Sequence, residues 1–236
     1  LWVIRNDRAG GRQGDGPALQ ASLPLMAEKH FRDEVLIALI DGLLEDQAEV
    51  VALDDEAALL RYAYRVAGTV GLLMCHVLDC HAPVARAHAI DLGIAMQLTN
   101  IARDVLEDAG MTRRYIPVDW VGGATPADIL SAAKAPGSGV HTDITAAVTR
   151  LLDMAEAFYA SGAQGYRYLP WRAHLSIAVA ARVYRQIGVQ LRAADCAWHD
   201  GRQVTGKVTK LRCSVVALAS LGSRFGAAER RHDQRL

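Results

Sequence analysis

The segment from Ile90 to Pro117 constrains the fold most, because it reads as a long apolar helix with a polar stripe along one side. Most of its other positions are Ile, Leu, Met, Ala or Val. The stripe has spacings of three, four and four residues, which place its members on one helical face: Gln97, Asn100, Asp104 and Asp108. A helix that is otherwise apolar is buried, and a buried carboxylate needs a partner. The stripe therefore predicts a wet cavity, a metal or a ligand.

Two interpretations of the stripe are open at this stage. In the first, it is the solvated face of an ordinary amphipathic helix, as most charged stripes are. In the second, Asp104 and Asp108 hold a hard cation such as Mg²⁺, which usually takes one or two protein carboxylates and completes its shell with water and substrate phosphates. The nearby cations Arg103, Arg113 and Arg114 favour the second interpretation, because guanidinium groups bind diphosphate in a bidentate manner.

Composition narrows the class of protein. With 51% hydrophobic and 22% charged residues, the 236-residue chain is typical of a globular domain. Its formal net charge is zero, so we expect no binding to nucleic acid. The four cysteines form no CxxC pair and are interpreted as reduced thiols in a cytoplasmic protein. No apolar run has the length of a membrane span, and no signal peptide is recognisable.

Helical periodicity runs through nearly the whole chain, and alternation with a period of two is almost absent. Pro83 is expected to open the helix that carries the stripe, and Asp54 or Asp55 to cap the preceding one. The other helices are expected at about residues 24–52, 55–79, 141–161, 170–196 and 206–224. Gly122, Gly123 and Pro126 are expected to break the chain.

The expected fold is an all-α, single-domain helical bundle with a central cavity. Residues 1–22 are rich in Gly, Arg and Asp and are expected to form a flexible segment. The helical domain is expected to span residues 23–226, and a polar tail to follow at residues 227–236.

The expected helix at 55–79 has one side with very little side-chain volume, at Gly68, Gly71 and Ala67. This side allows either close packing of two helices or room for a long apolar ligand. In the second case the cavity wall consists of Val66, Ala67, Val70 and Gly71. Tyr62 lies near the mouth of such a cavity, where a phenol can donate or accept a proton or stabilise a cation through its ring.

Two stretches together resemble the squalene/phytoene synthase family of head-to-head prenyl transferases. They are YAYRVAGTVG at residues 62–71 and LGIAMQLTNIARDVLEDAGMTRRYIP at residues 92–117. The resemblance runs from about residue 24 to residue 215. The stretches RYIPVDW and VYRQIGVQLRAADCAWHDGRQVTGKVTKL are most similar to the bacterial phytoene synthases. The resemblance implies an isoprenoid synthase-like fold.

The resemblance also implies roles for particular residues. Asp104 and Asp108 match an acidic DxxxD motif that binds Mg²⁺ (or Mn²⁺) and bridges to the substrate diphosphate. Tyr62 matches a tyrosine near the reacting carbons, so these three residues are the expected catalytic ones. The residues that match substrate-binding positions of the family are Gln97, Asn100, Arg103, Arg113, Tyr115, Tyr184 and Arg202.

The implied reaction joins two molecules of geranylgeranyl diphosphate head to head and gives phytoene through a cyclopropyl diphosphate, in carotenoid biosynthesis. No nicotinamide is needed, because no reduction follows. One alternative is a synthase of the squalene, dehydrosqualene or presqualene type that uses farnesyl diphosphate. Another is an inactive homologue that binds a lipid or a partner. Peripheral contact with the inner face of the membrane, for product release, is a further expectation.

One departure from the family pattern concerns a first acidic motif, of which no equivalent is found. Asp46 stands beside Glu45 and is not part of a DxxxD, and residues 54–56 are too close to Tyr62. The chain also begins with Leu1. We therefore expect the chain as given to be an incomplete portion of the enzyme that is inactive by itself.

Overall fold

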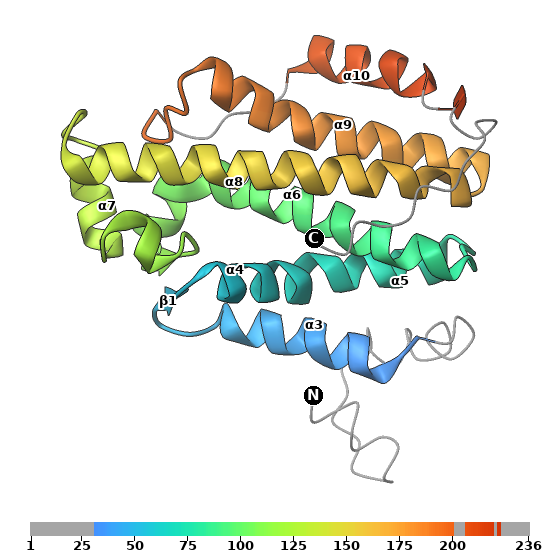
Figure 1. The fold of residues 1–236 in the computed structure, drawn as a ribbon, viewed down its shortest axis with the longest axis horizontal. Helices are drawn as coiled ribbons and strands as arrows, with labels where there is room; N and C mark the ends of the chain where they lie inside the picture. The colour runs from blue at the N-terminus through green and yellow to red at the C-terminus, as the bar shows by residue number, and fades with distance from the viewer. Residues whose placement is uncertain (1–30, 201–205, 220, 223–236) are drawn as a thin grey trace, which may run out of the picture.

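The computed structural model describes residues 31–200, 206–219 and 221–222. Long helices dominate it, and α6 (Pro83–Gly110) and α8 (Gly139–Gln164) form a central antiparallel pair (Figure 1). On one side of this pair lie α4 (Glu56–Ala63), the π-helical turn η1 (Tyr64–Gly68) and α5 (Thr69–Val77), with α3 (Asp33–Glu45) outside them. On the other side α9 (Trp171–Ala193) packs on the pair and α10 (Lys207–Ala219) packs on α9. The remaining elements are short: β1 (Val51–Ala52), β2 (Arg113–Arg114), η2 (Val118–Val121), α7 (Pro126–Ala132) and η3 (Gly165–Tyr168).

The core of the bundle lies where α6 meets α8. Leu98 on α6 and Ile144 and Leu151 on α8 are completely buried. Burial of one such side chain stabilises the fold by roughly 1.5–3 kcal/mol. The expected all-α bundle is therefore confirmed, and its central helix is the one that carries the polar stripe.

Several helix starts follow from local sequence. Asp55 caps α4 and accepts a hydrogen bond from the main-chain nitrogen of Ala58 at 2.7 Å. Pro83 is the first residue of α6, a position that needs no main-chain N–H donor. Ser138 caps α8, which therefore begins slightly before the expected residue 141. The expected helix at 55–79 is continuous but contains η1, a π-helical insertion of the kind often found near functional sites.

Other boundaries differ from the expectation. The first expected helix runs to residue 52, but α3 ends at Glu45 because Val51 and Ala52 pair with β2. That pairing joins segments far apart in the chain, so no local pattern indicates it. The break expected at Pro126 is in fact the start of α7, because proline is favoured in the first helical turn. Residues 1–22 and 227–236, for which a flexible segment and a polar tail were expected, lie outside the described residues.

The two short parallel strands fix the polar end of the bundle. Val51 pairs with Arg113, and Ala52 pairs with Arg114. The main-chain nitrogen of Leu53 also donates a hydrogen bond to the carbonyl oxygen of Arg114 at 3.2 Å. This pairing places the residues that follow α3 beside the residues that follow α6, and so brings Asp46 next to the end of the stripe helix.

Two glycines let the helices on either side of the cavity touch through their backbones. A Cβ atom at Gly71 would lie 2.1 Å from the carbonyl oxygen of Ala89, and one at Gly93 would lie 2.3 Å from that of Ala67. No larger residue fits at either position without a shift.

Among the described helices, none is both long and apolar enough to cross a bilayer.

Candidate active site

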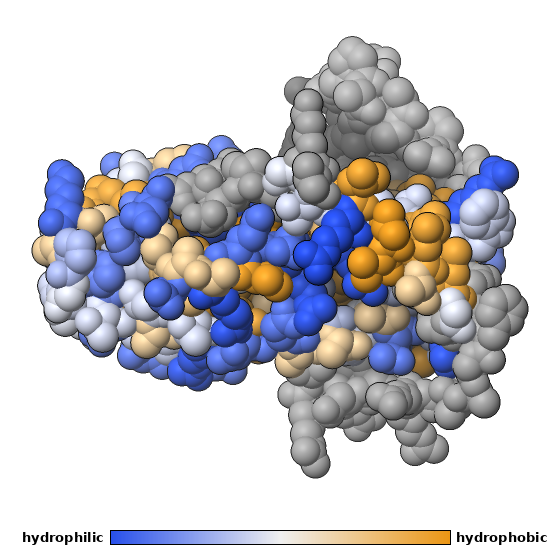
Figure 2. All heavy atoms as spheres, turned by 90° about the horizontal axis from the view of Figure 1, so that it is seen from above, coloured by the Kyte–Doolittle hydropathy of each residue, from blue (hydrophilic) through white to orange (hydrophobic). Residues whose placement is uncertain are grey.

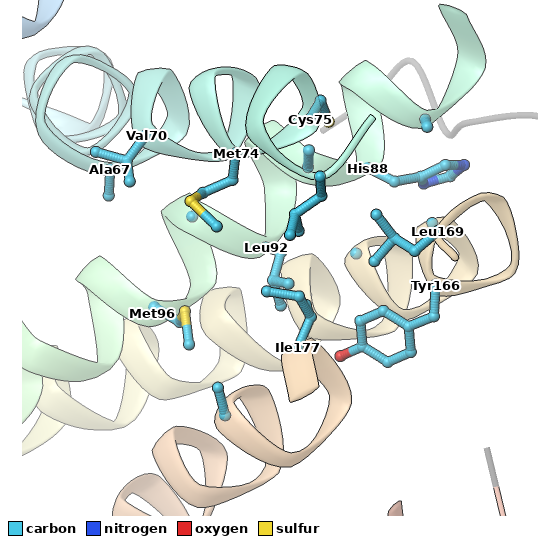
Figure 3. A pocket seen from close by; sticks show the side chains of 18 of the residues that line it. Ala67, Val70, Met74, Cys75, His88, Leu92, Met96, Tyr166, Leu169 and Ile177 are labelled. Carbon is cyan, nitrogen blue, oxygen red and sulfur yellow. The ribbon is translucent and has the colours of Figure 1, made fainter. Parts of the chain in front are cut away.

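A cavity of about 280 Å³ lies between α5, α6, η3 and α9. Figure 3 shows the labelled apolar side chains of these elements around it, including Met74, Leu92, Met96 and Ile177. The residues expected to form its wall, Val66, Ala67, Val70 and Gly71, all lie in its lining. For the small residues of the helix at 55–79, the sequence left two interpretations open, and the structure shows both. Gly71 allows close packing against α6, and the same side of the helix borders the cavity.

The cavity wall and the polar stripe are one continuous face of α6. The α6 residues that line the cavity follow helical spacing without a gap: Ala85, His88, Ala89, Leu92, Gly93, Met96, Gln97 and Asn100. Continuing this spacing by four residues leads to Asp104 and then Asp108. The apolar cavity therefore ends at Gln97 and Asn100, and the acidic residues follow on the same face. Tyr184 of α9 borders the cavity at its polar end.

Asp104 lies in a bidentate ion pair with the neighbouring Arg103. Arg103 Nε donates to Asp104 Oδ1 at 2.7 Å, and Nη2 donates to Oδ2 at 2.5 Å. The two side chains are only 10% and 16% exposed, so water screens the pair weakly. This hydrogen bonding raises the pKa of Arg103 further above its ordinary value, and Tyr184 is among its electrostatic neighbours. The arrangement brings Arg103, Asp104 and Tyr184 to one place.

Asp108 lies one turn further along, beside Arg113. Burial raises the pKa of the Asp108 carboxyl to about 7, the negative charge of Asp104 adds to the rise, and the positive charge of Arg113 opposes it. Asp108, Arg113 and Tyr115 border a second, very small hollow. The Arg114 guanidinium instead donates to the carbonyl oxygen of Ile116 at 3.1 Å. Of the two adjacent arginines, Arg113 is therefore the one whose charge acts on Asp108.

Tyr62 and Tyr115 are held together by Asp46, a residue that sequence reasoning did not include in the site. Tyr62 donates its hydroxyl hydrogen to Asp46 Oδ2 at 3.1 Å, and Tyr115 donates to Asp46 Oδ1 at 2.8 Å. The two rings stack with centroids 4.8 Å apart and an interplanar angle of 22°. Arg113 Nη2 donates to the main-chain oxygen of Asp46 at 2.9 Å. We call Asp46, Tyr62 and Tyr115 the phenol clasp.

The phenol clasp adjoins the acidic end of the site. Burial raises the pKa of Tyr115 to about 12 and that of Tyr62 well above its ordinary value, so both phenols stay protonated at neutral pH. The charge of Asp46 also contributes to the raised pKa of Asp108. Tyr62 itself is 4% exposed and does not belong to the described lining of the apolar cavity. The expected cavity tyrosine thus lies one helical turn from Val66, which does line the cavity.

The two carboxylates fit a divalent cation that takes its other ligands from the substrate and from water. Among the described residues, no group of three or more His, Cys, Asp or Glu side chains could hold a metal. Asp104 and Asp108 supply two carboxylates, and two are enough for Mg²⁺ when phosphate oxygens and water complete its shell. After burial, the charge of Asp104 is the next cause of the raised pKa of Asp108, and a bound cation would relieve this repulsion. Within the described part of the chain, Asn100 Oδ1 is buried without a hydrogen-bond partner, and Asn100 lines the cavity four residues before Asp104.

One expected substrate-binding residue, Arg202, lies outside the described residues. The other expected catalytic and substrate-binding residues form two neighbouring sets. The set at the end of the apolar cavity contains Gln97, Asn100, Arg103, Asp104 and Tyr184. The set beyond it, around Asp46, contains Asp108, Arg113, Tyr115 and Tyr62. The only sequence signal for Asp46 is an acid at the end of an apolar helix, which is too common to indicate a site.

Comparisons with known proteins give relatives that match most of this chain. The chain is 38% identical over 213 residues to a 15-cis-phytoene synthase from a Paracoccus species, an alignment that covers 88% of this chain and 67% of that protein. It is 34% identical over 211 residues to a phytoene synthase from Pseudescherichia vulneris, with 88% of this chain and 65% of that protein covered. The chain thus spans about two thirds of the length of these curated relatives.

A solved structure shares the fold. The crystal structure of a dehydrosqualene synthase in complex with ligand superposes with a TM-score of 0.70 at 25% sequence identity. The match covers 80% of this chain and 65% of that one. The profile of the squalene/phytoene synthase family matches residues 3–212, which is most of the chain. The chain therefore belongs to the squalene/phytoene synthase family.

Proposed function

We propose that this protein condenses two molecules of geranylgeranyl diphosphate head to head and produces phytoene through a cyclopropyl diphosphate. The observation that carries the proposal is the single face of α6, which is a largely apolar cavity wall from Ala85 to Met96, polar at Gln97 and Asn100, and acidic at Asp104 and Asp108. A prenyl diphosphate has the same division, with a hydrocarbon tail at one end and a diphosphate at the other. The relatives named phytoene synthase support the same assignment.

The length of the cavity supports a twenty-carbon substrate. The α6 residues in its lining run from Ala85 to Asn100, a span of about 22 Å at the helical rise of 1.5 Å per residue. An extended geranylgeranyl tail is about 19 Å long and a farnesyl tail about 14 Å, estimated from sixteen and twelve main-chain carbons and ordinary C–C bond lengths. A farnesyl tail would leave the end near Ala85, Cys80 and Leu169 unfilled.

Each residue of the site has a role in this proposal. Asp104 and Asp108 would hold Mg²⁺, which when bound neutralises the charge that develops on the leaving diphosphate. Arg103 and Arg113 would bind diphosphate oxygens through their guanidinium groups, and Arg103 would exchange its present partner Asp104 for them. The apolar lining would keep water from the allylic cation. Tyr62 would lie at the boundary between the two regions.

A contact with lipid is part of the proposal, because the hydrocarbon product is insoluble in water. Apolar side chains gather on the face that α10 covers (Figure 2). Leu211, Val215 and Leu218 are 68%, 59% and 52% exposed, and their helical spacing places them on one side of α10. We propose peripheral binding of this side to the inner face of the membrane. Vesicle flotation with Leu211→Ser and Val215→Ser would test it, and undiminished flotation would contradict it.

The test of the reaction uses the protein as its gene encodes it. Geranylgeranyl diphosphate and Mg²⁺ are supplied without NADPH, and hydrocarbon products are identified by mass and retention. We expect phytoene from geranylgeranyl diphosphate, and little product when farnesyl diphosphate replaces it. Turnover of farnesyl diphosphate alone would establish the alternative synthase. Binding of either diphosphate without turnover would establish an inactive homologue. The control is the Asp104→Ala/Asp108→Ala variant, which should give no product.

A further inference from the structure

Asp46 connects three separate parts of the site. It is the residue at the C-terminal end of α3, and its main-chain oxygen accepts a hydrogen bond from Arg113 Nη2 at 2.9 Å. Its two carboxylate oxygens each accept one phenol hydrogen, from Tyr62 on α4 and from Tyr115 after β2. Each carboxylate oxygen of Asp46 therefore already accepts a hydrogen bond from a phenol. These contacts indicate that Asp46 positions the two phenols.

The hydrogen bonds fix the direction in which each phenol can act. A phenol has a single hydrogen, and in the phenol clasp both hydrogens point to Asp46. Each phenol oxygen therefore offers its surroundings only lone pairs. The rings are stacked with centroids 4.8 Å apart, so each ring has one outer face, which is also electron-rich. Without Asp46, the Tyr62 hydroxyl could rotate and present its positive hydrogen to a nearby cation, which would be unfavourable.

We propose that Asp46 is a positioning residue for the reaction, which acts by keeping the hydroxyl hydrogens of Tyr62 and Tyr115 turned away from the carbocation. Tyr62 lies one helical turn from the cavity wall at Val66, and its phenol then turns toward the cation only its oxygen lone pairs and the ring face that is not stacked on Tyr115. Both attract positive charge. This inference rests on the proposed function, since it requires a reaction that passes through an allylic cation. It assigns to Asp46 a role that neither the acidic DxxxD motif nor the cavity lining contains.

The test is a double-mutant cycle on turnover, with the protein as its gene encodes it. In Asp46→Asn, the amide oxygen can accept one phenol hydrogen, but the amide nitrogen must donate to the other phenol. One phenol is therefore released or reversed. We expect kcat to fall about 10- to 100-fold, as for the loss of a hydrogen bond to a charged group. KM should change less than about threefold, because the metal and diphosphate ligands are retained.

The decisive result is whether the effect of Asp46→Asn on kcat depends on the presence of the Tyr62 hydroxyl. If Asp46 acts through this phenol, then adding Asp46→Asn to Tyr62→Phe should lower kcat by no more than about twofold. A general structural role predicts instead that the two losses multiply. The matched control is Glu49→Gln, which neutralises an exposed carboxylate three residues away and should leave kcat unchanged. If Asp46→Asn does not fold, Tyr115→Phe removes one donor and keeps the carboxylate, and kcat should fall less than tenfold.

The outcomes separate this inference from the proposed function. Multiplicative losses in the cycle, or a full kcat in Asp46→Asn, would overturn the role of Asp46 and leave the proposed reaction intact. Absence of turnover in the unmutated protein, with geranylgeranyl and with farnesyl diphosphate, would overturn the proposed function and this inference with it. Turnover of farnesyl diphosphate alone would change only the substrate, since the cycle can then be measured with that substrate.

Discussion

The close contact of α6 with η1 gives a quantitative prediction for Gly93→Ala. A Cβ atom there would lie 2.3 Å from the carbonyl oxygen of Ala67, about 1 Å less than the shortest ordinary contact of 3.4 Å. The contact is with main chain, so it cannot be relieved by a side-chain rotation. The two helices must separate, and the cavity wall formed by Ala67 and Gly93 must move with them.

The size of the stability change in Gly93→Ala follows from two opposing effects. Overpacking of a tight interior contact typically costs 1–3 kcal/mol, whereas alanine is favoured over glycine in a helix by about 1 kcal/mol. Because the clash at Gly93 involves backbone, we place the overpacking cost at the upper end, and the net loss at about 2 kcal/mol. For a chain of this size, that loss lowers Tm by roughly 4–8 °C.

The assay is thermal and urea unfolding of three proteins. Gly110→Ala is the matched control, because Gly110 ends the same helix and a Cβ atom there would meet nothing within 4 Å. We expect this control to be neutral or slightly stabilising, and Gly93→Ala to be destabilised. If Gly93→Ala has the same Tm as the unmutated protein, or a higher one, then α6 and η1 do not touch through their backbones, and the account of the cavity wall is wrong.

Three further predictions concern the site. Replacing Asp104 or Asp108 by Ala should lower turnover by orders of magnitude with little loss of folding, which steady-state rates and far-UV circular dichroism would check together. Between its ordinary pKa of 3.8 and its folded pKa of about 7, Asp108 binds more proton in the folded state than in the unfolded state. The contribution of Asp108 to the free energy of unfolding is therefore fully present below pH 3.8 and is lost as the pH rises through 7. The unmutated protein should lose stability between pH 5 and pH 8, and Asp108→Asn should lose less, as measured by urea unfolding in EDTA. Ala89→Phe should block the cavity about 16 Å from Asn100 and shift the preference in a competition assay from geranylgeranyl to farnesyl diphosphate. An unchanged preference would show that the tail does not follow α6.

The helices and the polar stripe could be predicted from the sequence because their signals are local. Pro83 and Asp55 mark helix starts through their own chemistry, and the spacing from Gln97 to Asp108 is a property of one helix. Tyr62 was predicted from its place beside the small residues of the helix at 55–79, and the resemblance to the family supplied the remaining site residues, including Tyr115.

The part that could not be predicted depends on contacts between distant segments. Asp46 reaches Tyr115 because Val51 pairs with Arg113, sixty-two residues later in the chain. The pairing involves two residues in each strand, which is too short for a periodic pattern. The pair of Arg103 with Asp104 is a different case, because the sequence already placed Arg103 beside the acids. Adjacent residues on a helix do not face each other, so the direct bidentate pairing through the long arginine side chain was not predicted.

The central claim is that one face of α6 binds both ends of the same substrate. The most direct test is a crystal structure of the protein as its gene encodes it, with Mg²⁺ and a thiolo-diphosphate analogue of geranylgeranyl diphosphate that does not ionise. The account predicts metal-bound diphosphate at Asp104 and Asp108, and a tail that extends past Met96 and Leu92 toward Ala85. A tail outside this cavity, or a diphosphate bound away from both carboxylates, would contradict it.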